Sequence, residues 1–179
     1  MIADPKGKMH GMDKAELQAM QAPLKERYRE EPAAALITLR ADGELDANQV
    51  ACKVDTGRAL VEAGLHPATG GTGALACSGD MLLEALVACA GVTLRSVATS
   101  MELDVSGSIH AEGDLDFRGT LGVDREAPVG FTAIRLRFDL DSDETEEKLD
   151  KLLELTERYC VVGQTLAGGV PVDFSYSIA

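Results

Sequence analysis

A single segment, residues 80–100, constrains the fold more than any other, because it predicts one long and mostly apolar helix. Its apolar side chains recur at helical spacing in two stripes, so little of its surface is polar. Ser78 or Asp80 is available as the N-cap residue. A helix of this kind is buried, and the rest of the chain must supply the elements that cover it.

Three predicted strands precede this helix. Residues 34–41 and 49–55 have strand patterns on either side of an Asp-Gly turn at 42–43. Residues 59–65 resume the extended pattern. The glycine-rich loop that follows, residues 64–79, lacks the Gly-Lys-Ser/Thr ending of a phosphate-binding loop, which favours a connection over a nucleotide site.

Strands and one more helix are predicted after the long helix. The segments with strand patterns are residues 104–113, 114–122, 131–140 and 172–178. Between the last two strands, residues 141–160 predict a helix with an acidic start, and Gly163 is its expected stop. This order predicts an α+β fold in which antiparallel sheets pack on the long central helix.

The N-terminal residues form a separate unit in this interpretation. Residues 12–30 predict one or two short helices, with Pro23 tolerated as the first residue of the second. Pro32 ends the segment. The predicted organisation is therefore an N-terminal helical arm over residues 1–32, followed by one domain over residues 33–179.

The charge of the chain limits its partners. Its 179 residues carry a formal net charge of −13, and no cluster of Lys and Arg interrupts it. Nucleic acid and anionic membrane surfaces are therefore not expected as partners, because both require a concentrated basic surface. The N-terminus lacks the apolar segment of a signal peptide, and the apolar run at residues 85–94 is about half as long as a membrane span. We expect a cytoplasmic protein.

The sequence has four cysteines, which are its candidate reactive residues. Cys52 fits a strand and Cys77 fits a loop. Cys89 and Cys160 both lie on or beside the apolar sides of the two predicted helices, so they could meet in one core. No CxxC pair is present and the three histidines are scattered, so neither a metal nor a cofactor is expected.

The sequence leaves two interpretations of Cys89 open. A free cysteine on an apolar helix is often an inert core residue. A reactive Cys89 needs a group that lowers its pKa, and the N-terminus of its own helix is too far away to do so. A guanidinium from another element would serve, and Arg58, in the break between two predicted strands, is the candidate.

The segment SGDMLLEALVACAGVTLR, which contains Cys89, resembles the central helix of the OsmC/Ohr family. That family has a second cysteine after two strands and an acidic helix, which fits Cys160 in ERYCVVGQTL. The resemblance extends over residues 33–179. It implies an OsmC-like fold and an intertwined homodimer whose sheets are completed across the interface.

The resemblance also implies a function, that of a thiol-dependent peroxidase which reduces organic hydroperoxides to alcohols. Cys89 would become a sulfenic acid, and Cys160 would resolve it as a disulfide. A dithiol such as a lipoyl group would then reduce the disulfide. Arg58 would hold the thiolate and polarise the peroxide.

Two positions depart from the family pattern. Gly79 stands where the family has the glutamate that partners the arginine, so Asp80 is the acid expected to substitute, with Glu84 as a weaker candidate. The Cys-Pro-Val/Tyr-Ser of the family is Cys-Val-Val-Gly from residue 160. These departures indicate a divergent subgroup. They leave one alternative: a non-catalytic dimer that senses redox state or binds a small molecule in an apolar pocket beside Cys89.

Overall fold

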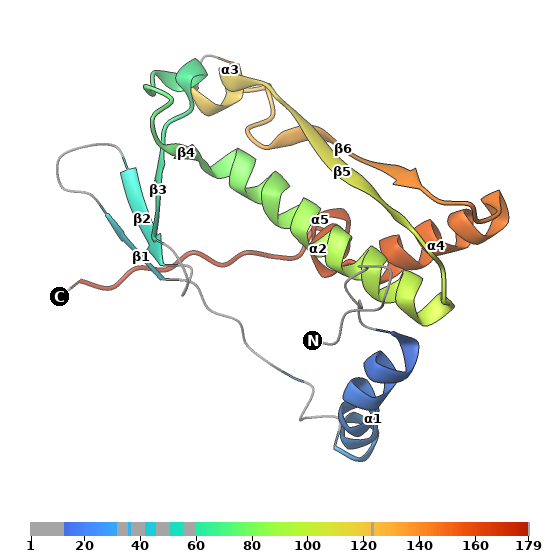
Figure 1. The fold of residues 1–179 in the computed structure, drawn as a ribbon. Coiled ribbons are helices and arrows are strands. Elements are labelled where there is room, and N and C mark those ends of the chain that lie inside the picture. Colours follow the sequence, from blue (N-terminus) through green and yellow to red (C-terminus); the bar gives the residue numbers. More distant parts are fainter. Residues whose placement is uncertain are drawn as a thin grey trace.

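The computed structural model describes residues 13–31, 36, 42–45, 51–55, 60–122 and 124–178. Within them it has the mixed helix and strand composition that the sequence predicts (Figure 1). The elements are α1 (Lys14–Glu30), β1 (Asp42–Leu45), β2 (Ala51–Asp55), β3 (Leu60–Gly64), the 3-10 helix η2 (Pro67–Thr69), β4 (Ala76–Cys77), α2 (Ser78–Met101), β5 (Ser106–Leu115), α3 (Phe117–Thr120), β6 (Phe131–Asp141), α4 (Glu146–Tyr159) and α5 (Val161–Gly168).

The long helix predicted from the sequence is confirmed as α2, which packs against β5, α4 and α5. Its buried residues follow one another at four-residue intervals along one face, and they are Leu86, Ala90, Leu94 and Ala98. By length and composition alone α2 is apolar enough to cross a membrane. It packs against α4, α5 and β5 (Figure 1), but only this one face is buried and Val92 is 73% exposed, so the prediction of a helix buried on most sides is wrong for the single chain.

The start of α2 differs from the prediction. Its N-cap residue is Cys77, whose side chain makes no capping hydrogen bond, and Ser78 already lies inside the helix. The reason is the strand before it: β4 pairs with β3 and holds Cys77 in an extended conformation, so the helix begins directly afterwards. Cys77 therefore belongs to a short strand rather than to the loop predicted for it.

Strands β1 to β4 form one sheet in chain order, with β1, β2 and β3 antiparallel and β4 parallel to β3. The strands predicted over 49–55 and 59–65 are confirmed as β2 and β3. The turn predicted at 42–43 is wrong, because both residues lie in β1 and pair with Asp55 and Val54 of β2. The strand predicted over 34–41 lies outside the described residues, apart from Leu36.

Strands β5 and β6 form a long antiparallel hairpin that lies along α2 (Figure 1). The alternation predicted for β6 is confirmed, since every second residue from Ile134 to Leu140 is partly buried. The two strands predicted over 104–122 are instead one strand followed by α3. Pairing with β6 continues to Leu115, and the Asp116 side chain then caps α3 by accepting from the Arg118 N–H at 3.0 Å.

The second predicted helix is confirmed as α4, which places Leu152 and Thr156 in the core at 0% and 2% exposure. The helix does not continue to Gly163. It ends at Cys160, which has an extended conformation and separates α4 from α5. Gly163 is therefore not a helix stop but a residue of α5, where its N–H donates to the Cys160 sulfur at 3.4 Å.

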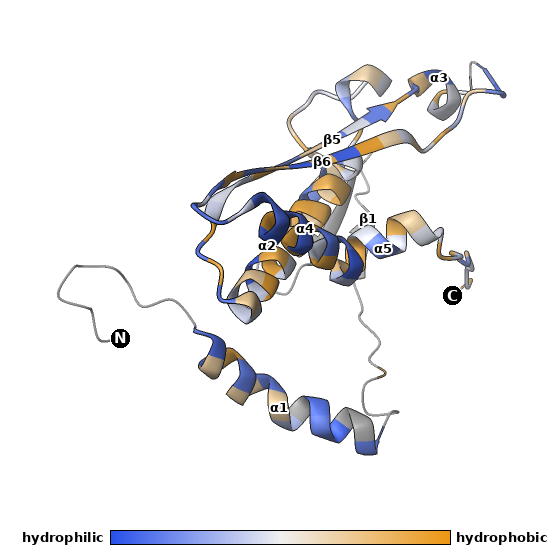
Figure 2. Cartoon of the chain, turned by 90° about the vertical axis from the view of Figure 1, so that its right-hand side faces the viewer, coloured by the Kyte–Doolittle hydropathy of each residue, from blue (hydrophilic) through white to orange (hydrophobic). Residues whose placement is uncertain are grey.

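The N-terminal helix α1 differs from the domain that follows it. Of the one or two N-terminal helices predicted, the structure has one, because α1 continues through Pro23. Lys14 of α1 forms an ion pair of 2.9 Å with Glu102, the residue that follows α2. Figure 2 shows α1 as mainly hydrophilic, whereas hydrophobic residues gather on α2 and β6.

The strand predicted over 172–178 is absent among the described residues. Residues 170–178 run away from α5 towards the β1–β3 end of the molecule without a paired strand (Figure 1). The apolar side chains that alternate along this C-terminal segment are exposed, and they are Val172, Phe174, Tyr176 and Ile178. The predicted alternation is thus present, but a strand also requires a neighbouring strand, and none within the described chain reaches it.

Candidate functional site

Cys89 of α2 and Cys160 at the α4–α5 junction lie in the same hydrophobic cluster. Leu86, Ala90 and Cys160 form its buried centre, and Cys89 and Val162 pack against them. Cys160 is 3% exposed, whereas Cys89 is only partly buried. Both sulfurs are free thiols, and Cys89 packs against the cluster that contains Cys160. The prediction that the two cysteines meet in one core is therefore confirmed.

Small residues on α2 bring this part of the helix close to the hairpin. A side chain at Gly91 would place its Cβ 3.0 Å from the Ile109 side chain of β5, so glycine permits the approach. Ala90 is fully buried between Cys89 and Gly91. The run of small residues at 88–91 thus serves the packing of α2 on β5 and keeps Cys89 at the edge of the buried face.

The interruption between α4 and α5 at Cys160 places a helix N-terminus at this site. Cys160 has φ −72° and ψ 104°, which is an extended conformation, and α5 begins at the next residue. The first N–H groups of a helix have no carbonyl partner within it, and they carry partial positive charge. In α5 one of these groups, the Gly163 N–H, donates to the Cys160 sulfur.

The electrostatics of the two thiols differ. Burial acts to raise the pKa of Cys89, but its polar surroundings, which are the start of α5 at Val161 and Val162 and the Cys160 thiol, outweigh it, so the pKa is lowered from its ordinary value. Burial raises the pKa of Cys160, and the neighbouring Cys89 raises it further. Of the two, Cys89 is the sulfur that more readily becomes a thiolate, which is the nucleophilic form.

Sequence reasoning missed the role of α5. It considered only the N-terminus of the helix that carries Cys89, and it treated the chain after Cys160 as the end of a helix. A signal was present, because residues 161–168 lack proline and the Gly168-Gly169 pair is a possible helix C-terminus. A second helix after Cys160 would have been the better prediction.

The other two predicted site residues are Arg58 and Asp80. Arg58 lies outside the described residues. Asp80 is exposed in the first turn of α2, nine residues before Cys89, which corresponds to about 13 Å along a helix. Asp80 instead lines a cavity of about 370 Å³ together with His66 and Cys77. Within the described ranges no charged side chain contributes to the pKa of Cys89.

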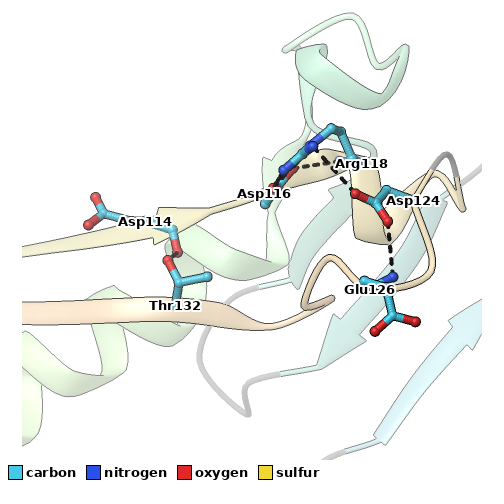
Figure 3. Close-up of polar contacts among 6 residues, drawn as sticks. All are labelled: Asp114, Asp116, Arg118, Asp124, Glu126 and Thr132. Carbon is cyan, nitrogen blue, oxygen red and sulfur yellow. Dashed lines mark hydrogen bonds and ion pairs between the residues drawn. The ribbon is translucent and has the colours of Figure 1, made fainter.

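The arginines at the hairpin are already paired with acids. Arg118 binds Asp116 at 2.6 Å and Asp124 at 3.4 Å, and this network closes the connection after α3 (Figure 3). Arg135 pairs with Asp114 and Arg137 with Asp139. These guanidinium groups stabilise the hairpin surface and are not directed at the thiols.

A larger cavity has Cys160, Leu86 and Ala90 in its lining. It has a volume of about 610 Å³, between β6, α4 and α5. Its walls are mainly apolar, with Phe131 and Leu166 among them, and Glu157 and Gln164 provide polar groups at its lining. The cavity has the size of a small-molecule site. In the part of the chain that the structure covers, no group of His, Cys, Asp and Glu side chains is arranged to hold a metal ion.

Comparison with protein families and solved structures finds related proteins. The family described as OsmC-like protein matches residues 71–175, more than half of the chain. No curated protein sequence matches. An OsmC-like protein from Mycoplasma pneumoniae has a similar structure, with a TM-score of 0.61 and 16% identity over 74% of this chain and 89% of that one.

Two further similar structures have functional names. The organic hydroperoxide resistance protein OsmC from Legionella pneumophila has a TM-score of 0.54 at 17% identity, over 75% of this chain and 92% of that one. An organic hydroperoxide resistance protein from Elizabethkingia anophelis has a TM-score of 0.53 at 17% identity, over 75% and 91%. Identities this low show the fold alone, and the OsmC-like fold predicted from the central helix is thereby confirmed.

Proposed function

Because the chain belongs to the OsmC-like family, we propose that it is a thiol-dependent peroxidase that reduces organic hydroperoxides to alcohols. The names of two similar structures, both organic hydroperoxide resistance proteins, support the class of substrate. The observation that carries the proposal is the contact of a partly exposed thiol of lowered pKa, Cys89, with a buried thiol, Cys160. An inert core cysteine has no need of this arrangement.

The proposed reaction begins at Cys89. Its thiolate attacks the distal oxygen of ROOH, the O–O bond breaks, and the leaving alkoxide takes a proton to become ROH. The sulfur gains the distal oxygen and becomes a sulfenic acid, so the peroxide is reduced by two electrons. The sulfur is oxidised by the same two electrons.

Cys160 completes the cycle. Its thiol attacks the Cys89 sulfenic acid, a disulfide forms, and the oxygen leaves as water together with the thiol proton. A dithiol such as a lipoyl group then exchanges with the disulfide, so that both cysteines return to thiols and the dithiol becomes a cyclic disulfide. The packing of both cysteines in one cluster supports this step.

Arg58 and Asp80 keep a role in this proposal. Arg58 lies in the connection between β2 and β3, and the same sheet continues through β4 into α2. From there its guanidinium would polarise the peroxide and stabilise the negative charge that develops on the leaving oxygen. Asp80, in the first turn of α2, would hold that guanidinium in place.

A homodimer is also part of the proposal. The C-terminal segment exposes Phe174 at 94%, and α2 exposes Val92 at 73%. Apolar side chains of this size and number are covered when a second subunit packs on them. An intertwined dimer whose sheets are completed by strands of both chains would supply that cover. We place this dimer in the cytoplasm, on the basis of the sequence.

A second candidate function rests on the cavity of about 610 Å³ beside Cys160. Its apolar walls suit a small aromatic or aliphatic ligand. In this case the protein would be a non-catalytic dimer that binds the ligand, and the thiols would report the redox state by forming their disulfide. Retention of such a ligand through native purification, together with the absence of peroxide turnover, would favour this candidate.

Turnover of cumene hydroperoxide with a lipoyl dithiol as reductant tests the peroxidase. The wild-type protein is expected to consume peroxide, and Cys89→Ser is expected to lose at least about a hundredfold of the rate, because a hydroxyl is not a nucleophile of comparable strength. Cys77→Ser is the matched control, expected within about twofold of wild type, since Cys77 lies at the far end of α2. Full activity in Cys89→Ser would contradict the proposal.

A further inference from the structure

We propose that the cavity of about 610 Å³ lined by Cys160 binds the dithiol that returns the disulfide to thiols, and that this dithiol attacks the Cys160 sulfur. The cavity selects an uncharged dithiol over an anionic one. The inference rests on the proposed function and deepens it, because it identifies where the second substrate binds, which sulfur it attacks and what charge it carries.

The lining of the cavity distinguishes the two cysteines. Cys160 contributes to the lining, and Cys89 does not. From α2 the lining receives Leu86 and Ala90, the two residues that form the buried cluster with Cys160. A molecule that occupies the cavity therefore contacts Cys160 and does not contact Cys89.

The cavity suits a dithiol with a hydrocarbon chain. A volume of about 610 Å³ lies within the range of small-molecule sites. Three elements supply aliphatic side chains to the walls, and these are Ile134 and Leu136 of β6, Leu153 of α4 and Leu166 of α5. Methylene groups of a ligand gain free energy when walls of this kind remove them from water.

The charge of the lining favours an uncharged ligand. Glu157 is exposed and lines the cavity, and among the residues that the structure describes no Lys, Arg or His joins it there. The Gln164 side chain donates to the Glu157 carbonyl at 2.9 Å and so ties α5 to α4 at this wall. A ligand with a carboxylate therefore meets a like charge, which an uncharged ligand of the same shape avoids.

The first exchange takes place at Cys160. A thiolate of the dithiol attacks the Cys160 sulfur, the bond between the two cysteines breaks, and Cys89 leaves as a thiolate. A disulfide then joins Cys160 to the dithiol. The direction of attack suits the two thiols, because the pKa of Cys89 is lowered, the pKa of Cys160 is raised, and the thiol of lower pKa leaves faster.

The second exchange releases Cys160. The other thiolate of the dithiol attacks the ligand sulfur that is bound to Cys160, the mixed disulfide breaks, and the dithiol closes to a cyclic disulfide. The Gly163 N–H donates to the Cys160 sulfur at 3.4 Å, so it stabilises the negative charge that develops there. The two thiol protons end on the two cysteines, and the dithiol has lost the two electrons that the protein disulfide gains.

Trapping the mixed disulfide tests the site of attack. The full-length protein is oxidised with diamide, freed of diamide and mixed with benzyl mercaptan, an uncharged monothiol that cannot close to a cyclic disulfide. Acid quenching within the first turnover and peptide mass mapping then locate the adduct. We expect the adduct on Cys160 and a thiol at Cys89. An adduct on Cys89, or a protein in which diamide does not link the two cysteines, would overturn the inference.

Filling the cavity tests where the dithiol binds. Ala167 lines the cavity at an exposed position of α5, so Ala167→Phe adds a bulky group without disturbing buried packing. Single-turnover reduction of the disulfide by dihydrolipoamide is expected to slow at least about tenfold in this variant. Thr165→Phe, exposed on the same helix and outside the lining, is the matched control and should stay within about twofold of wild type. Equal rates in the two variants would overturn the inference.

A pair of dithiols tests the role of charge. Dihydrolipoamide and dihydrolipoate differ in an amide and a carboxylate, and the amide is expected to reduce the wild-type disulfide about threefold faster. Glu157→Gln should make the two rates equal. Glu154→Gln removes the same charge from α4 outside the lining and should keep the difference. The same ratio of rates in all three proteins would overturn the inference.

All three measurements start from a disulfide that is formed without peroxide. A protein with the adduct on Cys160 but without peroxide turnover would keep this inference about the exchange and reject the proposed peroxidase. Peroxide turnover with the adduct on Cys89 would do the reverse.

Discussion

Two regions of the molecule differ in how far a single chain completes them. Around the thiols, α2, α4, α5 and the β5–β6 hairpin cover one another, and Ala90, Ala98 and Leu152 are completely buried. The C-terminal segment has an equally regular apolar pattern, but Phe174 and Ile178 are 94% and 87% exposed.

This difference separates two parts of the proposed mechanism. The pair Cys89 and Cys160, with the first turn of α5, is assembled within one chain. The C-terminal segment has the pattern of a strand, but none of the described strands pairs with it, and we expect a second molecule to cover its side chains. We therefore expect the stability of the thiol site to depend on the core of one subunit, and the C-terminal segment to govern association.

The largest loss of stability is expected from a substitution in the core that surrounds the thiols. Leu152→Ala removes a fully buried side chain from the α4 face against α2, and it should lower the free energy of unfolding by about 2–5 kcal/mol. Leu153→Ala is the matched control, because Leu153 is 36% exposed and should cost about 1 kcal/mol. Urea denaturation compares the two variants. Equal losses would show that the buried face of α4 has been assigned wrongly.

A smaller effect is expected from a substitution in the C-terminal segment, and it should change the association of subunits rather than their folding. Phe174→Ser should raise the dissociation constant of the dimer at least about tenfold, because an apolar side chain covered by the partner contributes about 1.5–3 kcal/mol. Ser175→Ala, on the alternate side of the segment, should leave association unchanged. Sedimentation equilibrium measures both. If the wild-type protein remains a monomer at every concentration, the expectation that a second subunit covers the C-terminal segment is wrong.

Elements whose pattern depends only on the chain itself were predicted from the sequence. The apolar stripes of α2, the alternation of β6 and the acidic start of α4 are local features, and all three elements form where they were expected. The contact of Cys89 with Cys160 followed from these helices, since both carry their cysteine on or beside the face that packs in the core.

The errors lie where a neighbouring element decides the local structure. Pairing with β2 draws residues 42–43 into a strand, and pairing with β6 extends β5 through Leu115. The helix break at Cys160 depends on a sulfur that caps the next helix, which no propensity of the Val-Val-Gly sequence indicates. For the same reason the Gly163 N–H that donates to the Cys160 sulfur was missed, because it is free to do so only when α5 begins after Cys160.

The most direct test of the central claim is the covalent state of the protein after one equivalent of cumene hydroperoxide. Peptide mass mapping of the reduced protein before and after treatment should show a Cys89–Cys160 linked peptide, one equivalent of alcohol, and an intact mass lower by about two hydrogens. Consumption of peroxide without that linked peptide, or with a disulfide through Cys77 in its place, would contradict the account.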